Sequence, residues 1–273
     1  MSEVKAILVA AESAVLEAGE KIKPLFGRVM GVKAKESPTD LYSDADLLAE
    51  ETIFAALAKK FPKFNYRSEE REFIDRGSEY CWVVDPLDGS TAFIAGLDYW
   101  GISIGLLKGK KAVVGVIYIP AKDWLFRAGR GKGSWLNGKK MRVSKQGVMD
   151  KAMVGFDVGH RGYRAKDMVQ NIVPLVDRVR YMPSFACSTF GQSLVALGTY
   201  DAYLHHRAYI WDFCAGSIIV EEAGGRVTDQ RGKALDWSKV ENMSMVCSNG
   251  LIHDKVLELM GIRDWMGDGK IGG

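Results

Sequence analysis

Two carboxylates followed by a glycine and two hydroxyl residues form the segment of this sequence that could most directly do chemistry. Asp85 and Asp88 come directly after Tyr80 to Val84, a nearly all-apolar run that predicts a strand buried on both faces. Acidic groups beside a buried strand are costly unless a positive partner compensates them. Hard divalent cations accept carboxylate and carbonyl oxygens, so Mg²⁺ is the natural partner, and Leu87 could offer only its backbone carbonyl. The alternative interpretation is an ordinary turn in which an aspartate caps a helix.

The residues that follow could hold an anion. Gly89, Ser90 and Thr91 open toward residues 92–94, which predict a short helix. The free N–H groups at the start of a helix favour a phosphate in front of it. Carboxylates for a cation and N–H groups for a phosphate would therefore meet in one segment.

Two further acidic segments lie elsewhere in the chain. Asp212, in the run Trp211 to Gly216, stands at the start of a strongly apolar stretch that predicts a helix, where an aspartate is also a common N-cap. Glu69 and Glu70, after Ser68, precede a polar stretch, a pattern typical of a solvated surface. Neither segment identifies a site by itself.

Taken together and in this order, the three segments resemble the inositol monophosphatase family of Mg²⁺-dependent, lithium-sensitive phosphomonoesterases. The family pattern has an acidic Gly-Glu-Glu-like element, then Asp-Pro-x-Asp-Gly-(Thr/Ser), then Trp-Asp-x-Ala-Gly. The resemblance covers most of residues 1–260 without a large insertion. Outside the acidic segments it extends over Ser37 to Leu41 with Asp46, Gly131 to Gly138, and Glu222 to Gly225.

The resemblance implies a role for each matching residue. The implied Mg²⁺ ligands are the carboxylates of four residues and one backbone carbonyl: Glu69, Asp85, Asp88, Asp212 and the carbonyl of Leu87. The implied catalytic residues hold the attacking water or the water shell of a weaker metal: Ser90 with Asp46, and Glu70. The implied substrate-binding residues are Asp88, Gly89, Ser90, His205 and Asp212, and Lys35 matches a basic residue on a mobile loop.

The sequence departs from the family pattern mainly where the substrate would bind. Ser68 stands where the family usually has Gly, and Ser90 keeps the hydroxyl that many members supply as Thr. His205 stands where inositol phosphatases commonly place a Glu, and the run Pro183 to Ser188 lacks the usual Arg-x-x-Gly-Ser/Thr-Ala. His205, with the following His206 and Arg207, could favour a second anionic group on the substrate, or the imidazoles could simply be solvated at a strand end. We therefore expect an intact metal site and an altered substrate wall.

The elements around these segments predict a layered α+β protein. Apolar residues at helical spacing predict helices over 4–26 and 47–61, and short connections between apolar runs over 80–128 imply antiparallel strands. Asn137-Gly138 is a tight-turn signal, and the second half alternates strands with helices. The resemblance implies an αβαβα sandwich of the sugar phosphatase type with mixed, largely antiparallel sheets. We expect one compact unit of two α/β halves: residues 1–145 with most metal ligands, and 146–273 with Asp212 and the substrate wall.

Composition excludes several classes of protein. The chain has 273 residues, 47% hydrophobic and 26% charged, as in ordinary globular domains, and a net charge of +3, too small for a dedicated nucleic-acid binder. Four cysteines without a Cys-x-x-Cys pair predict buried thiols in a reducing compartment. No apolar run reaches the ~18 residues of a transmembrane helix, and the N-terminus lacks a signal-peptide pattern. We expect a cytoplasmic protein with no membrane contact, and the resemblance implies a homodimer.

The leading functional hypothesis is a Mg²⁺-dependent phosphatase acting on inositol monophosphate or a related sugar phosphate through a metal-activated water. Relatives with the same chemistry hydrolyse 3′-phosphoadenosine 5′-phosphate, fructose 1,6-bisphosphate or histidinol phosphate. These compounds remain alternative substrates for this protein. The alternative to an enzyme is a regulatory protein that kept the phosphatase fold but no longer hydrolyses phosphate esters. Some relatives work with RNA-associated machinery, which supports this hypothesis.

Overall fold

The computed structural model describes residues 3–28, 31–34, 41–158, 162 and 164–260. The expectations for Lys35 and for the run Ser37 to Asp40 lie outside the described residues. Among the described helices, none combines the length and the apolar composition that a membrane span requires.

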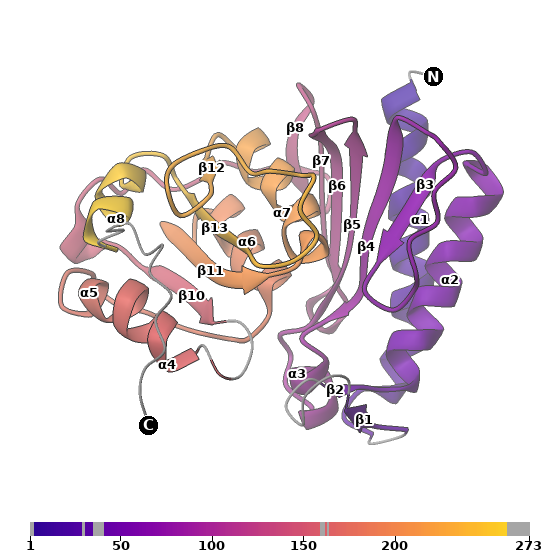
Figure 1. Cartoon of the computed structure of the whole chain (residues 1–273), viewed down its shortest axis with the longest axis horizontal. Coiled ribbons are helices and arrows are strands. Elements are labelled where there is room, and N and C mark those ends of the chain that lie inside the picture. Colours follow the sequence, from indigo (N-terminus) through magenta and orange to yellow (C-terminus); the bar gives the residue numbers. More distant parts are fainter. Residues whose placement is uncertain (1–2, 29–30, 35–40, 159–161, 163, 261–273) are drawn as a thin grey trace.

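The described chain is a stack of alternating helical and sheet layers (Figure 1). A seven-stranded sheet packs on one face against α1 (Glu3–Ile22) and α2 (Asp44–Lys60) and on the other against α7 (Ile210–Glu222). Helices α6 (Ser188–Ala196) and α7 then meet a four-stranded sheet, and α8 (His253–Leu259) packs against its strand β13 (Met243–Ser248). The αβαβα sandwich expected from the resemblance is confirmed. The proposed division into halves at residue 145 stays a prediction.

Both sheets are mixed and largely antiparallel. The seven-stranded sheet runs in the order of the chain: β3 (Asn65–Ser68), β4 (Tyr80–Asp88), β5 (Gly101–Lys108), β6 (Lys111–Ile119), β7 (Trp124–Gly129), β8 (Gly133–Leu136) and β9 (Lys139–Lys140). The four-stranded sheet has the order β10 (Val154–Val158), β11 (Ala202–Ala208), β13, β12 (Arg226–Thr228). Only β3–β4 and β10–β11 pair in parallel among these named strands. Short elements complete the description: β1 (Lys33–Ala34), β2 (Leu41–Tyr42) and α3 (Ser90–Ala95).

Helix α7 lies at the centre of the stack because the sheet beneath it leaves room for its backbone. A Cβ at Gly105 of β5 would collide with Cys214, and a Cβ at Gly115 of β6 would collide with the backbone of Ala215. The two glycines therefore let α7 approach the strands closely. Since most of α7 is fully buried, the position of its first turn is fixed by packing along its length.

One expected helix is broken in the structure. The sequence predicts a helix over 165–179, whereas the chain forms α4 (Arg164–Asp167), a π-helical segment (Met168–Ile172) and α5 (Val173–Val176). Pro174 has no N–H to donate to the preceding turn and its ring crowds that turn, which accounts for the widened segment. The thiol expectation holds among the described residues, where all four cysteines are free and only Cys81 is not fully buried.

Candidate metal centre and active site

Three carboxylates from two distant segments meet at one point. Each of Asp85, Asp88 and Asp212 offers an oxygen that lies within 4.8 Å of those of the other two. Asp85 and Asp88 are 1% and 8% exposed, so the cluster is largely removed from water. Carboxylates that lie this close together and are this well shielded from water repel one another strongly unless a cation lies between them.

A β-bulge is what turns Asp85 and Asp88 toward the same side. Residues three apart in a regular strand point to opposite faces of the sheet. In β4, however, Asp85 pairs with Ser103 and Asp88 with Gly101, so the strand carries one residue more than its partner β5 over this stretch. The extra residue brings both carboxylates to one side, and the Leu87 N–H donates to Asp85 Oδ1 at 3.1 Å. The strand therefore continues through Asp88 rather than ending at Asp85.

Asp212 is not the N-cap of its helix. The N-cap of α7 is Tyr209, and Asp212 occupies the third helical position, where its Oδ2 accepts the Tyr209 N–H at 2.6 Å. This bond from the N-cap N–H fixes the carboxylate in the first turn. The helix start is also held by a bond from the Ile210 N–H to the Val240 carbonyl at 2.8 Å.

The start of α6 holds Asp88 from the other side. Asp88 Oδ2 accepts the Ser188 hydroxyl at 2.9 Å and the Thr189 N–H at 2.5 Å, and the Cys187 thiol lies 3.5 Å away. The same Ser188 hydroxyl lies 3.1 Å from the Asp212 carbonyl, which Gln192 Nε2 also approaches at 2.7 Å. Burial raises the pKa of the Asp88 carboxyl, against the lowering effect of these hydrogen bonds.

The segment 184–187, just before α6, is fixed by a buried carboxylate that was not among the predicted site residues. Asp157 on β10 is 4% exposed and accepts bonds from the Ser184 hydroxyl (2.8 Å), the Ala186 N–H (2.8 Å), the Cys187 N–H (3.2 Å) and the Tyr203 hydroxyl (2.7 Å). Ala186 adopts a positive φ of 52°, a conformation that a non-glycine residue rarely holds without such support. Asp157 therefore positions residues 184–187, which lead to Ser188, and Ser188 in turn donates a hydrogen bond to Asp88. The only sequence signal was an acid inside an apolar strand.

Ser90 and Asp46 lie together beside the cluster. Ser90 Oγ is 2.8 Å from Asp46 Oδ1 and 2.9 Å from the Leu87 carbonyl. Asp46 belongs to the first turn of α2 rather than to the preceding loop, and its Oδ2 accepts the N–H (2.7 Å) and hydroxyl (2.8 Å) of Ser43. The Asp46 carboxylate thus has a fixed orientation next to the hydroxyl.

Gly89 connects the strand to α3 in a conformation that suits glycine. Its φ is +84°, and a Cβ there would lie 3.0 Å from the Tyr99 carbonyl. Ser90 begins α3, so the predicted short helix after the second aspartate is confirmed.

Glu69 and Glu70 line a hollow next to the cluster, although neither belongs to the three-carboxylate group. The hollow has a volume of about 410 Å³ and is also lined by Trp211, the neighbour of Asp212, and by Val240. Ser68 lies in β3 without a positive φ, so the serine in place of the family glycine is tolerated. Trp211 connects the hollow to Asp212 along the chain, while none of the three clustered aspartates lines the hollow itself.

The two histidines of β11 face opposite sides. His205 pairs with Asp157 across the sheet, and its ring packs edge-on against Phe213, the neighbour of Asp212, at 5.5 Å. His206 is 1% exposed, its Nδ1 lies 3.1 Å from Gln230 Oε1, and burial lowers its pKa. The alternative of two solvated imidazoles is therefore wrong for His206, which is buried and turned away from its neighbour.

Arg207 is committed to an ion pair. Its Nε lies 3.1 Å from Asp167 Oδ2, and Asp167 is 3% exposed. Of the three basic residues that could favour a second anion, the structure turns only His205 toward the residues around Asp212.

The donor set of the cluster suits a hard divalent cation. It offers three carboxylates, and among the described residues no imidazole or thiolate, which zinc and copper prefer, belongs to it. The described residues therefore fit Mg²⁺ by chemistry.

This chain is similar to known proteins over most of its length. The model of the "Inositol monophosphatase family" matches residues 3–262. An inositol-1-monophosphatase of Mesorhizobium japonicum is 33% identical over 259 residues, which cover 93% of this chain and 95% of that protein. A fructose-1,6-bisphosphatase/inositol-1-monophosphatase of Aquifex aeolicus is 31% identical over 261 residues, covering 95% and 97%. The crystal structure of the extragenic suppressor protein suhB of Bartonella henselae superposes with a TM-score of 0.88 at 31% identity, covering 94% of this chain and 99% of that one.

Proposed function

Because this chain belongs to the inositol monophosphatase family, whose members are phosphoric monoester hydrolases, we propose that it hydrolyses a small phosphate monoester of inositol or a related sugar with Mg²⁺. The observation that carries this proposal is the meeting of Asp85, Asp88 and Asp212 within 4.8 Å in a largely buried position.

In this proposal the chain's acidic residues hold the metal. The residues that would bind Mg²⁺ are Glu69, Asp85, Asp88, Asp212 and the carbonyl of Leu87. Bound Mg²⁺ would neutralise phosphate charge, lower the pKa of a water and stabilise the leaving oxygen. The Asp88 hydrogen bonds to Ser188 and Thr189 support the assignment, because they fix the carboxylate in place.

Ser90 and Asp46 would handle the proton of the attacking water. A hydroxyl that donates to a buried, oriented carboxylate presents its own lone pairs to a water. The 2.8 Å contact between Ser90 Oγ and Asp46 Oδ1 is the arrangement that this role requires. Glu70 would contribute from the rim, where it lines the adjoining hollow.

The phosphate would bind at the turn into α3. The N–H groups of Gly89 and Ser90 stand where the strand ends and the helix begins, beside the acidic cluster. His205 would face the rest of the substrate, since its ring packs beside Phe213 next to Asp212. An imidazole at this position forms different hydrogen bonds with a polyol than a carboxylate would form. We therefore propose a broad or shifted substrate specificity.

Further properties follow from the family and are part of the same proposal. We expect inhibition by Li⁺, assembly into a homodimer and residence in the cytoplasm. The free cysteines support a reducing compartment. Sedimentation equilibrium tests the dimer, and a phosphate-release assay with and without Li⁺ tests the inhibition.

A second candidate function is regulatory. The Bartonella henselae structure carries the description of an extragenic suppressor protein, which names a genetic effect rather than an enzyme. A chain of this kind could act by binding a partner while its hydrolytic site is idle. The grouping of Asp85, Asp88 and Asp212 favours the enzymatic function.

One experiment separates the two functions. Phosphate release would be measured for the purified chain with Mg²⁺ or EDTA on inositol 1-phosphate, fructose 1,6-bisphosphate, 3′-phosphoadenosine 5′-phosphate and histidinol phosphate. We expect Mg²⁺-dependent turnover of at least one monoester. Absence of turnover on the whole panel by a folded protein would contradict the phosphatase proposal.

A further inference from the structure

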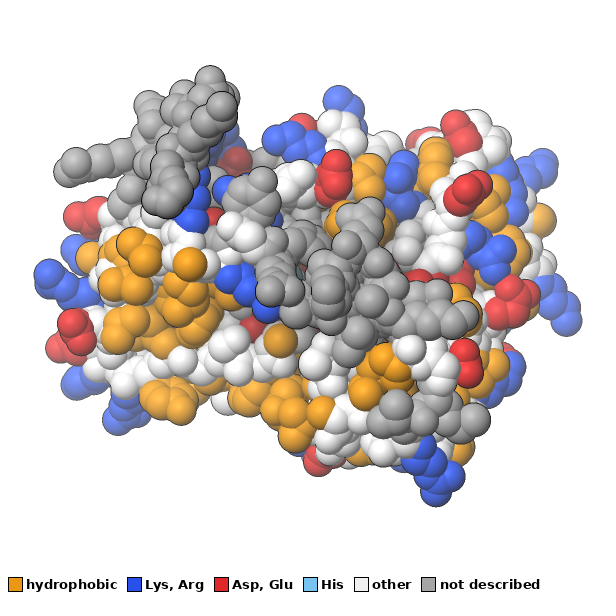
Figure 2. All heavy atoms as spheres, turned by 60° about the horizontal axis from the view of Figure 1, so that its bottom comes forward, with side chains coloured by type: hydrophobic (Ala, Val, Ile, Leu, Met, Phe, Trp, Pro, Cys, Tyr) orange, Lys and Arg blue, Asp and Glu red, His pale blue; other side chains and the backbone are white. Residues whose placement is uncertain are grey.

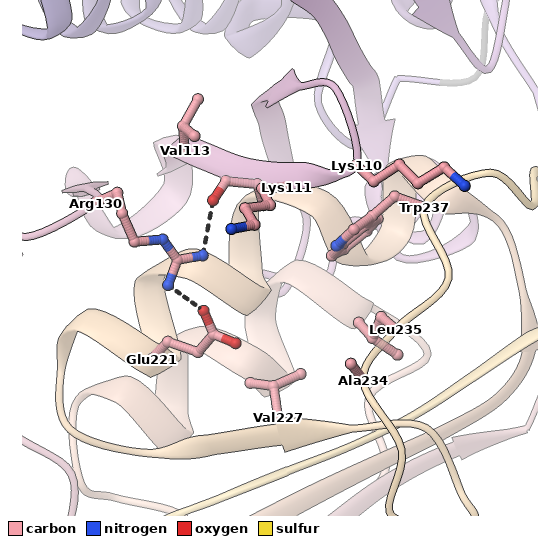
Figure 3. A pocket seen from close by; sticks show the side chains of 10 residues that line it. Lys110, Lys111, Val113, Arg130, Glu221, Val227, Ala234, Leu235 and Trp237 are labelled. Atoms are coloured by element: carbon pink, nitrogen blue, oxygen red, sulfur yellow. Dashed lines mark hydrogen bonds and ion pairs between the residues drawn. The ribbon is translucent and has the colours of Figure 1, made fainter.

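A second hollow, drawn in Figure 3, is lined by Glu221 in the last turn of α7, whereas Asp212 of the acidic cluster lies in the first turn of that helix. It has a volume of about 510 Å³, within the ~300–1,000 Å³ range of small-molecule sites. Glu221, on its wall, is nine residues beyond Asp212, about 14 Å along the helix at ~1.5 Å per residue. The hollow is therefore separate from the candidate active site.

The hollow is built from parts of the chain that are far apart in sequence. One side comes from the β5–β6 turn, the start of β6 and the residue after β7, and the other from the last turn of α7, from β12 and from residues 234–237. The lining residues are Lys110, Lys111, Ala112, Val113, Arg130, Glu221, Val227, Ala234, Leu235 and Trp237. A ligand there would touch both the seven-stranded sheet and the segment that packs beside the four-stranded one.

The charges of the hollow favour an anion. Arg130 donates to Glu221 at 2.6 Å and to the Ala112 carbonyl at 2.7 Å, so it neutralises the one acidic residue of the lining. Asp236 lies in the chain between the lining residues Leu235 and Trp237, and its pKa is lowered mainly by hydrogen bonds from Ser238, with a smaller contribution from Lys110. Lys111 makes no ion pair within the part of the chain that the structure describes. Figure 3 shows its amine directed into the hollow on the side of Arg130.

The remaining wall is apolar and includes an aromatic ring. Val227, Ala234 and Leu235 face the cationic side, and Trp237 closes one end (Figure 3). Leu235 and Trp237 are partly buried and pack against the main hydrophobic core, so this wall is anchored rather than free. Aromatic and aliphatic surfaces opposite a lysine and an arginine suit a flat apolar body that carries a negative group.

We propose that this hollow binds a small aromatic anion, with the anionic group at the amine of Lys111, beside the Arg130–Glu221 pair, and the ring against Leu235 and Trp237. The site does not depend on the proposed hydrolysis. Occupancy would bridge the β5–β6 turn and the segment 234–237.

The test is calorimetric titration of the full chain with naphthalene-1-sulfonate in EDTA, where the acidic cluster without metal repels anions. We expect saturable binding at one site. Inorganic sulfate carries only the charge and 1-naphthol only the ring, so each should bind at least ~tenfold more weakly.

A pair of variants locates the binding. Lys111→Gln should weaken naphthalene-1-sulfonate at least ~tenfold, the loss expected of one charged hydrogen bond. Lys140→Gln is the matched control, because Lys140 is also an exposed strand lysine, 5.9 Å from the ring of Trp135, but does not line the hollow. It should leave the affinity unchanged. Absence of saturable binding, or equal weakening by the two variants, would overturn the proposal.

Discussion

The acidic cluster and the substrate wall of the candidate site are built in different ways. The cluster uses two short segments whose chemistry is visible locally: an aspartate pair on one bulged strand and one aspartate in the first turn of a helix. The wall depends on Asp157, which organises residues 184–187 through bonds that span about thirty positions in sequence. Residues of the cluster should therefore control the reaction directly, while residues of the wall should act through position and specificity.

The largest effect should come from the cluster. Asp212→Asn removes a formal charge and a metal-ligand oxygen while the Tyr209 N–H can still be bonded. We expect turnover to fall at least ~10²-fold, the size of effect known for single electrostatic groups. Steady-state phosphate release at saturating Mg²⁺ measures it. Asp254→Asn is the control, since Asp254 is an exposed partner of Arg226. Near-normal turnover in Asp212→Asn would remove that residue from the metal site.

The next effect should come from the hydroxyl beside the cluster. Ser90→Ala leaves the carboxylates in place but deprives the attacking water of an orienting group. We expect kcat to fall by up to ~10²-fold with little change in KM, as for an interaction made mainly in the transition state. The exposed neighbour Thr91 provides the control variant Thr91→Ala. If KM alone rises, Ser90 binds substrate instead.

The wall should respond to loss of its buried carboxylate. In Asp157→Asn one oxygen becomes an NH₂ group that faces N–H or O–H donors, whichever way the amide turns. We expect the apparent Mg²⁺ affinity to fall ~30-fold, because Asp88 is held by the segment that Asp157 positions. Mg²⁺ titration well below the unfolding temperature separates this effect from lost stability. Tyr203→Phe removes only one of the four donors and should change the Mg²⁺ affinity less. An unchanged Mg²⁺ affinity would mean that the wall and the cluster are independent.

The smallest effect should be a change of preference. His205→Glu restores an acceptor for sugar hydroxyls and removes a group that, when protonated, attracts a second phosphate. We expect kcat/KM for inositol 1-phosphate relative to fructose 1,6-bisphosphate to rise about tenfold, or ~1.5 kcal/mol. His206→Gln is the internal comparison, because His206 faces the other side of the strand. A ratio that stays the same would mean that His205 does not face the substrate.

The sequence allowed a good prediction of the elements and indicated the three aspartates that the structure groups, because both depend on local patterns. Apolar spacing and turn residues such as Asn137-Gly138 predicted strands and helices close to their observed places. The bulge between Asp85 and Asp88 could not be predicted, since it depends on pairing with β5. Asp157 was missed for the same reason: its four donors come from other segments. Strand periodicity predicts that His205 and His206 point to opposite sides of the strand. It does not predict which of the two histidines faces the candidate site.

The acidic residues also differ in how closely the structure groups them. Asp85, Asp88 and Asp212 form one cluster, whereas Glu69 and Glu70 line the adjoining hollow. The resemblance implies that Glu69 is a ligand of the same metal site and that Glu70 acts on the water shell of a weaker metal, whereas the structure groups only the three aspartates. The site roles as a whole stay predictions until a metal is located.

The most direct test is a crystal structure of the chain soaked with Mn²⁺, a stand-in for Mg²⁺ with measurable anomalous scattering. The account predicts an anomalous peak bonded to carboxylate oxygens of Asp85, Asp88 and Asp212, and loss of that peak in crystals of Asp212→Asn. A well-ordered cluster without a peak, or a peak that persists unchanged in the variant, would contradict the assignment of this cluster as the metal centre.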